Sequence, residues 1–273
     1  MVNSLKSEYE LSFFIWNTPP QYTFSTYIHC KFNSMLHFAI AEDLEYDRNR
    51  LKAELSYFRN HQLTICANNG FELLIALKNV KRLPDFLLLD IQMPKIDGLI
   101  LTQYITLRYP TIKIIGISSH SNEALVTEVL SEGAIGFITK YFLAKESIVY
   151  LNVHGKKNIF FEALEAALLN EQYIDCLLFN KTKEIKRSKS TKEIIREKFG
   201  NLNDLQIEYL ILNAADLTHK EIAQILNKSP ASIKHYYNCI SSQFNITSRS
   251  GLVYFCTTNG IVKHPRFYDE NAN

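Results

Sequence analysis

The chain has 273 residues, 47% hydrophobic and 21% charged, a composition typical of a globular protein with one or two domains. A formal net charge of +2 does not by itself indicate a polyanionic or a membrane partner. The apolar run near the N-terminus, residues 11–16, is too short for a signal peptide or a membrane span, so we expect a cytoplasmic protein without a membrane partner.

The cysteines support the same compartment. None of them has the close spacing of a metal-ligand pair, which excludes a zinc site and a disulfide framework and favours a reducing environment. They lie far apart along the chain, at Cys30, Cys66, Cys176, Cys239 and Cys256.

The N-terminal extension, residues 1–34, contains many aromatic side chains and the break Pro19-Pro20, but it has no clear period. We assign it no role. Met35 stands directly before the first predicted strand, so our hypothesis is that the natural protein begins at Met35.

From Met35 onward, short apolar runs alternate with segments of helical spacing. The runs have strand length, and the segments between them place leucines and isoleucines on one face. Five alternations predict an α/β domain over residues 35–155, with a doubly wound five-stranded parallel sheet. The predicted strands are 36–41, 63–67, 84–89, 112–117 and 136–139, and the predicted helices are 47–58, 70–78, 99–108, 122–132 and 145–154.

Chemically matched side chains follow four of these strands. Glu42 and Asp43 end the first, Asp90 the third, Ser118 the fourth and Lys140 the fifth. The carboxyl ends of parallel strands meet at one edge of a sheet, so these groups are expected to share one cleft. Taken alone, Asp90 has a second interpretation, as a helix cap after a buried strand.

Three clustered carboxylates repel each other unless a cation lies between them, and an all-oxygen set of this size suits Mg²⁺. A carboxylate can also attack phosphorus to form an acyl phosphate. The ammonium of Lys140 and the metal would then neutralise the transferring phosphoryl group, and Ser118 would bond one of its oxygens. The cleft therefore predicts phosphoryl chemistry.

The stretch from Met35 to about His154 resembles the receiver domain of two-component response regulators, which has a flavodoxin-like fold. The resemblance rests on the strand-end groups, on Met93-Pro94 and Gly98, and on residues 133–140. It implies that Asp90 is the phosphoacceptor. It also implies a Mg²⁺ site made by Asp43, Asp90 and the backbone carbonyl of Gln92, with Glu42 acting partly through water.

The resemblance further implies a switch pair, Ser118 and Phe137, in which a hydroxyl moves to the phosphoryl group and an aromatic ring follows. Three positions depart from the common pattern. Ser118 replaces the usual Thr but keeps the hydroxyl, Phe137 replaces the frequent Tyr and loses its hydrogen bond, and Tyr141 follows Lys140 where Pro or Asp is usual.

Residues 156–200 are predicted to be a helical and basic linker. Residues 159–178 have helical periodicity, and residues 181–198 carry eight basic against three acidic side chains. We interpret the basic part as a solvated tether, with a phosphate-binding stripe as the alternative.

Residues 201–263 predict a small all-α domain of four short helices, followed by a tail at 264–273. Asn203 caps the first helix, Thr218 and Glu221 form a capping box, and Ser229 precedes Pro230 at a helix start. Two capped helices joined by a tight turn indicate a helix-turn-helix.

This domain resembles the LuxR-type helix-turn-helix of response-regulator transcription factors. The residues that carry the resemblance are 220–223, 229–234 and 248–253. It implies a DNA-contacting set that combines phosphate contacts with base readout. The set consists of Lys220, Ser232, Lys234, His235, Asn238 and Arg249. The alternative is a small helical protein-interaction module.

Together these features predict a regulator that is not an enzyme: a sensor histidine kinase phosphorylates Asp90, and the chain then binds double-stranded DNA, as a homodimer when phosphorylated or DNA-bound. One rival is a DNA binder whose receiver acts only in protein contacts, independently of phosphorylation. Another is a phosphatase with an aspartate nucleophile. The resemblance to such enzymes would require the pattern Asp-x-Asp at the strand end, but here Gln92 occupies the position of the second aspartate.

Overall fold

The structure is a computed structural model, and none of its helices among the described residues is long and apolar enough to cross a membrane. The predicted N-terminal extension, the predicted helix at 145–154 and the C-terminal tail lie outside the residues that it describes. The described residues are 35–56, 60–119, 123–143, 159–175, 191–198 and 202–263.

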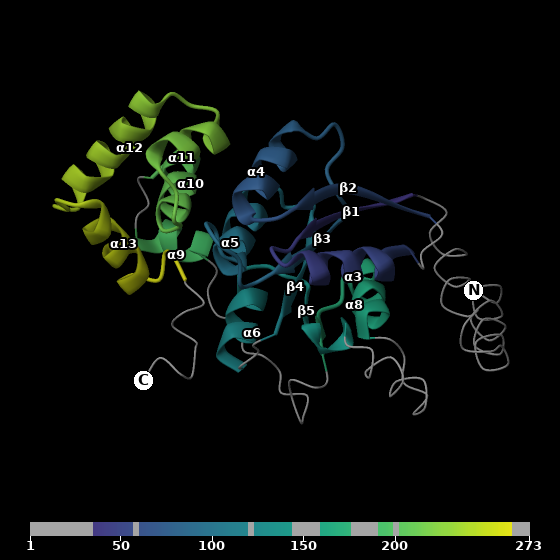
Figure 1. Cartoon of the computed structure of the whole chain (residues 1–273). Coiled ribbons are helices and arrows are strands. Elements are labelled where there is room, and N and C mark those ends of the chain that lie inside the picture. The colour runs from purple at the N-terminus through teal and green to yellow at the C-terminus, as the bar shows by residue number, and fades with distance from the viewer. Residues whose placement is uncertain are drawn as a thin grey trace, which may run out of the picture.

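The N-terminal domain is built on one parallel sheet, which confirms the predicted doubly wound architecture (Figure 1). The strand order is β2-β1-β3-β4-β5-β6. The chain crosses from one half of the sheet to the other after β2, so the ends of β1 and β3 lie side by side. The strands are β1 (Leu36–Ala41), β2 (His61–Ala67), β3 (Phe86–Asp90), β4 (Lys113–Ser118), β5 (Gly136–Thr139) and β6 (Tyr173–Ile174).

Helices cover both faces of this sheet. Side chains alternate along β3, so Phe86 and Leu88 pack with α3 (Glu45–Ser56) and α8 (Ile159–Leu168). Leu87 and Leu89 point to the other face and pack with the remaining helices of the domain. These are α4 (Gly70–Asn79), α5 (Gly98–Arg108) and α6 (Glu123–Ser131). The continuous apolar runs predicted as strands are therefore buried on both sides.

The sheet has six strands, and the prediction of five is corrected. The helical period read over residues 159–178 holds only to Leu168, because Asn170 adopts a left-handed conformation with φ 59° that ends the helix. The chain then returns along β5, where the Tyr173 amide donates to the carbonyl of Ile135 at 2.9 Å. Part of the segment predicted as a linker thus belongs to the sheet.

A buried carboxylate fastens this sixth strand. Asp175 is fully buried, and its Oδ2 atom accepts a 2.6 Å hydrogen bond from the Thr139 hydroxyl. Its backbone amide donates to the carbonyl of Phe137 at 3.0 Å. The edge of the sheet beside the end of β5 is therefore closed by the chain itself.

The C-terminal domain consists of short helices, and the predicted caps at Asn203, Thr218 and Ser229 are confirmed. Asn203 and Thr218 form capping boxes, and the Ser229 and Ser248 side chains accept hydrogen bonds from the first turns that follow them. Asn227, with φ 54°, makes the turn between the second and third of these helices. The helices are α10 (Asp204–Asn213), α11 (His219–Leu226), α12 (Pro230–Gln243) and α13 (Arg249–Thr258).

One more helix, α9 (Thr191–Lys198), lies where a solvated tether was predicted. Its first residue is buried: the Thr191 amide donates to Glu132 Oε2 at 3.2 Å, and the Thr191 hydroxyl accepts from Gln103 Nε2 at 2.6 Å. Ile195 is also buried. These contacts with the N-terminal domain explain why the segment is helical despite its charge.

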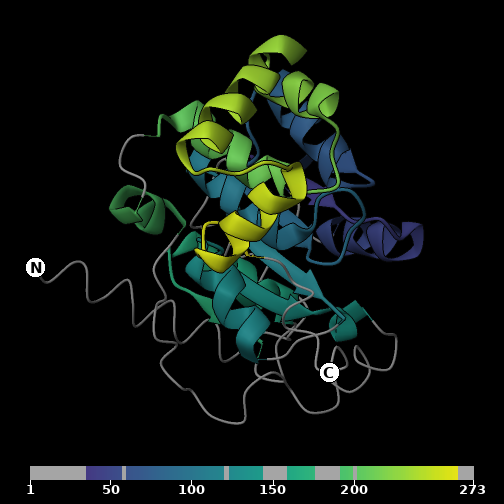
Figure 2. The same cartoon turned by 90° about the vertical axis from the view of Figure 1, so that its left-hand side faces the viewer.

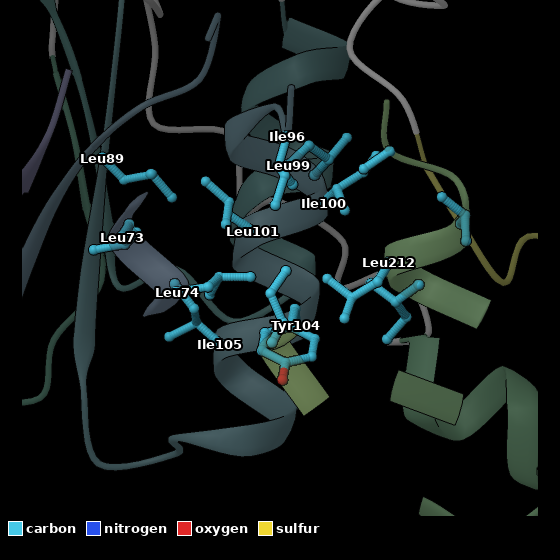
Figure 3. Packing of buried hydrophobic residues seen from close by; sticks show 14 of the residues in the cluster. Leu73, Leu74, Leu89, Ile96, Leu99, Ile100, Leu101, Tyr104, Ile105 and Leu212 are labelled. Carbon is cyan, nitrogen blue, oxygen red and sulfur yellow. The ribbon is translucent and has the colours of Figure 1, made fainter. Parts of the chain in front are cut away.

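The two domains lie against each other (Figure 2), and apolar side chains from both belong to one buried cluster. Leu212 of α10 faces α5, where Ile100 and Tyr104 belong to the same buried cluster (Figure 3). This cluster is continuous from the face of the sheet that α4, α5 and α6 cover into the helix-turn-helix. The interface is therefore a shared core in this state, rather than a loose contact between domains.

Polar contacts tie the loop after β3 to the helix-turn-helix. Lys95 in this loop forms a 3.0 Å ion pair with Glu221 of α11, and its carbonyl accepts a 2.9 Å hydrogen bond from the Asp216 amide. Lys78 at the end of α4 donates to the carbonyl of Gln224 at 2.9 Å. The segment that follows Asp90 is thus in direct contact with the first helix of the helix-turn-helix.

Candidate functional site

Three carboxylates gather where β1 and β3 end, as the strand-end pattern predicts. One oxygen from each of Glu42, Asp43 and Asp90 lies within 4.8 Å of the others. Glu42 and Asp90 are buried, whereas Asp43 is partly exposed. The cluster therefore has two enclosed members and one that opens to solvent.

Lys140, which follows β5, brings the positive charge. Its ammonium lies 2.9 Å from Glu42 Oε1 and 3.1 Å from Asp90 Oδ2. A third carboxylate, that of Asp47 in α3, lies 3.3 Å away. Burial alone lowers the pKa of Lys140, but the carboxylates of Asp90 and Glu42 outweigh it and raise the pKa, so the lysine is charged.

Backbone contacts fix the acidic residues. Arg48 of α3 donates to the carbonyls of Glu42 and Asp43 at 2.7 and 3.1 Å, which holds the loop after β1. The Gln92 amide donates to Asp90 Oδ1 at 3.1 Å. Because both Oδ atoms of Asp90 have partners before any ligand arrives, its carboxylate has a defined orientation.

Asp97, not Asp90, caps the helix that follows. The Asp97 side chain accepts a 2.9 Å hydrogen bond from the Ile100 amide at the start of α5. Gly98 lies so close to β3 that a Cβ atom there would stand 2.4 Å from the carbonyl oxygen of Asp90. The alternative interpretation of Asp90 as a helix cap is therefore wrong, and the Asp97-Gly98 pair serves to seat α5 against the site.

The buried carboxylates fit a cation. Burial and the neighbouring Asp90 raise the pKa of Glu42 to about 7, and burial raises that of Asp90 to about 6 against the opposing effect of Lys140. The second oxygen of Glu42, Oε2, is buried and has no hydrogen-bond partner within the described part of the chain. A hard divalent cation with oxygen ligands would satisfy this atom and relieve the repulsion, which fits Mg²⁺.

Added Mg²⁺ is expected to stabilise the protein more strongly as pH rises from about 5 to about 8. Raised pKa values favour the folded state while these carboxylates are protonated, and that contribution is lost as pH rises through about 6 and 7. The metal needs the deprotonated ligands, so its stabilisation grows over the same interval. Thermal melts in EDTA and in excess Mg²⁺ at each pH measure it. A constant Mg²⁺ increment would contradict this expectation.

The predicted switch residues lie in the two strands that follow β3 in the sheet. Ser118 is fully buried at the end of β4, next to Thr139 in the sheet register. Phe137 is also fully buried and points to the face that α6 covers, since a Cβ atom on Gly116 would touch both the Phe137 ring and Val129 of α6 at 3.2 Å. The structure thus places the hydroxyl at the site edge and the ring under α6.

The DNA-contacting residues implied by the resemblance fall into two groups. Lys234, His235 and Asn238 are exposed on α12, and Lys220 is exposed on α11. Ser232 is half-buried beside the cap of α12, with its hydroxyl 2.9 Å from that of Ser229.

Arg249 lies outside that exposed group. Its guanidinium donates to Asn213 Oδ1 at 2.9 Å and to the carbonyl of Leu217. The side chain is half-buried and joins α13 to the region between α10 and α11. In this state Arg249 supports the domain internally rather than presenting its charge to solvent.

The amino-acid pattern did not single out Asp47, Arg48 or Lys95. Asp47 and Arg48 lie on the first turn of α3, a segment read only for its apolar spacing. Lys95 has φ 67° in the loop after Asp90, a conformation that no sequence signal at a lysine indicates.

The geometry above, a parallel sheet with an acidic cluster and a lysine at its strand ends, defines a receiver. Comparison with protein families agrees, because residues 38–152 match the response regulator receiver domain. Residues 38–152 are therefore a receiver domain of this type, and the helical domain that follows it resembles the LuxR-type helix-turn-helix.

The chain is similar to curated proteins that are named transcriptional regulatory proteins. The transcriptional regulatory protein LnrK of Bacillus subtilis is 29% identical over 232 residues, which are 83% of this chain and 99% of LnrK. DegU of Brevibacillus brevis is 28% identical and covers 66% of this chain and 76% of its own. A structure of RcsB from Salmonella typhimurium is 18% identical, covers 82% of this chain and 99% of its own, and has a TM-score of 0.44.

Proposed function

We propose that this response regulator accepts a phosphoryl group on Asp90 from a sensor histidine kinase and then binds double-stranded DNA as a homodimer. The observation that carries the proposal is the Lys140 ammonium, which bridges the buried carboxylates of Glu42 and Asp90 at 2.9 and 3.1 Å. A lysine in this position supplies the counter-charge that a transferring phosphoryl group requires.

The proposed step is a displacement at phosphorus. An oxygen of the Asp90 carboxylate bonds to phosphorus while the P–N bond to the kinase histidine breaks, and the electron pair leaves with the imidazole. Glu42, Asp43 and Asp90, with the carbonyl of Gln92, would hold Mg²⁺, which would supply charge neutralisation. Lys140 pairs with a phosphoryl oxygen, and the hydroxyl of Ser118 donates to another. The product is a changed state of the protein, not a released metabolite.

The interdomain contacts support a route from Asp90 to DNA. The loop after Asp90 carries Lys95, which is paired with Glu221 of α11 at 3.0 Å. In a helix-turn-helix the first helix crosses the DNA backbone, and here that helix is α11, which packs against α4 of the receiver. A change in the loop would alter its contact with α11, the helix that would also lie against the DNA backbone. The side chains of α12 that would read the bases are already exposed.

Beryllofluoride with Mg²⁺, which mimics an aspartyl phosphate, is expected to convert the full chain to a dimer and to increase its affinity for DNA. The reason is that the mimic adds charge and oxygen acceptors at Asp90, which Ser118 and Lys140 then approach. Light scattering coupled to gel filtration measures the mass with Mg²⁺ alone and with both additions. Mg²⁺ alone is the control.

The rival function is a DNA-binding regulator whose receiver acts as a phosphorylation-independent interaction module. The buried apolar cluster that contains both Tyr104 of the receiver and Leu212 of α10 favours a fixed two-domain body of this kind. If beryllofluoride changes neither the mass nor the DNA affinity, the rival is supported and the proposal fails.

A further inference from the structure

Lys140 has a third carboxylate partner that lies outside the metal-binding set. Asp47 Oδ2 stands 3.3 Å from the Lys140 ammonium. Asp47 is not part of the Glu42, Asp43 and Asp90 cluster found among the described residues. Both side chains are largely enclosed, with 10% of Lys140 and 17% of Asp47 exposed, so this is not a solvated surface pair.

Each partner of Lys140 has a different fate in the reaction. A lysine ammonium has three N–H donors, of which two bond to Glu42 and Asp90, while Asp47 adds an ion pair at 3.3 Å. Glu42 and Asp90 also belong to the carboxylate cluster that would bind a divalent cation. Asp90 in addition loses its carboxylate charge when it becomes an acyl phosphate. Asp47 alone keeps its charge for Lys140 throughout.

We propose that Asp47 is a positioning residue for phosphoryl acceptance, an inference that rests on the proposed function. Mg²⁺ held by Glu42, Asp43 and Asp90 would repel the Lys140 ammonium and would weaken its attraction to Glu42 and Asp90. The Asp47 carboxylate then holds one N–H of Lys140, so that the other two remain aimed at the place where phosphoryl oxygens arrive. Without Asp47 the charged side chain swings towards solvent and must be brought back for each transfer.

The position of Asp47 on α3 fits this role better than a purely helical one. Glu45 and Asp47 both lie on the first turn of α3, where acidic residues complement the helix dipole. Glu45 is exposed, whereas Asp47 points to Lys140 across the gap between α3 and the end of β5. The neighbouring Arg48 fixes this turn by its bonds to the carbonyls of Glu42 and Asp43.

The first test compares Asp47→Asn with Glu45→Gln, which removes the same charge two residues away. Phosphoryl uptake by the full chain from a small donor, acetyl phosphate, is measured as a function of Mg²⁺ concentration. Asp47→Asn is expected to lower the maximal rate about tenfold, the size of a lost charged hydrogen bond, and Asp47→Glu to restore part of it. Glu45→Gln is expected to have the same maximal rate of uptake and the same thermal midpoint as the parent chain.

The second test follows Lys140 directly and needs no phosphoryl donor. Acetylation of Lys140 by an N-hydroxysuccinimide ester is followed by peptide mass spectrometry, with and without Mg²⁺. In Asp47→Asn, Mg²⁺ is expected to make Lys140 react several times faster, while the parent chain and Glu45→Gln stay protected. Equal labelling and equal uptake in all variants would overturn the inference. A parent chain that takes up no phosphoryl group would refute the proposed function, whereas the labelling would still decide whether Asp47 holds Lys140.

Discussion

Asp90→Asn is expected to abolish the formation of an acid-stable, alkali-labile phosphoryl group on this chain. The carboxamide nitrogen is no nucleophile towards phosphorus, and the substitution also removes one of the two buried carboxylates that pair with Lys140. Glu42 also pairs with Lys140 at 2.9 Å, but Arg48 holds the backbone carbonyls of Glu42 and Asp43, so neither carboxylate can move into the place of Asp90. We therefore expect a complete loss rather than a slowed reaction. Incubation with labelled acetyl phosphate and Mg²⁺, followed by electrophoresis, measures it.

The fold of this variant should survive, since Asn is isosteric with Asp. Removing a buried carboxylate whose pKa is raised by burial is expected to stabilise the metal-free receiver at neutral pH. A normal or raised thermal midpoint therefore serves as the control for folding. Labelling of Asp90→Asn at the parental level would show that another residue accepts the phosphoryl group.

Lys234→Ala is expected to weaken DNA binding by about 1–3 kcal/mol, or about 5- to 150-fold in affinity. Lys234 is exposed on α12, the helix that follows the αL turn at Asn227 and therefore occupies the place of a recognition helix. If the lysine meets a base edge, the loss depends on sequence. If it meets a phosphate, the loss is uniform and the salt dependence falls by about one counterion.

The measurement uses a duplex selected from a random pool by the parent chain, titrated with each variant at several salt concentrations. Lys52→Ala is the matched control, because Lys52 is an exposed lysine on α3, on the far side of the receiver from α12 (Figure 1). Equal affinities for the parent chain and Lys234→Ala would exclude α12 as the DNA-reading helix.

The sequence predicts the receiver core well because two local signals coincide there. The strand runs such as residues 86–89 are apolar at every position, and in a parallel sheet both faces are buried, so the pattern has one sensible interpretation. The strand-end rule then places Glu42, Asp90 and Lys140 together without any long-range information. The caps of α11 and α12 are local for the same reason: Thr218 and Ser229 bond within their own first turns.

The parts that the sequence missed depend on contacts between distant segments. Residues 173–174 carry no strong strand signal. They pair with β5 because the Asp175 carboxylate accepts a hydrogen bond from Thr139, which lies 36 positions earlier in the sequence. The Asp47 carboxylate similarly meets Lys140 only because α3 folds back on β1. Residues 191–198 form a helix because Thr191 is buried against Gln103 and Glu132 of the receiver.

The most direct test of this account is to locate the phosphoryl group on the full chain. After incubation with a small phosphodonor and Mg²⁺, borohydride reduces an aspartyl phosphate to homoserine, and peptide mass spectrometry identifies the converted residue. Conversion to homoserine is expected at Asp90 alone, within the peptide that spans β3 and the loop that follows it. Conversion at another aspartate, or a stable phosphate on a serine or histidine with Asp90 unchanged, would contradict it.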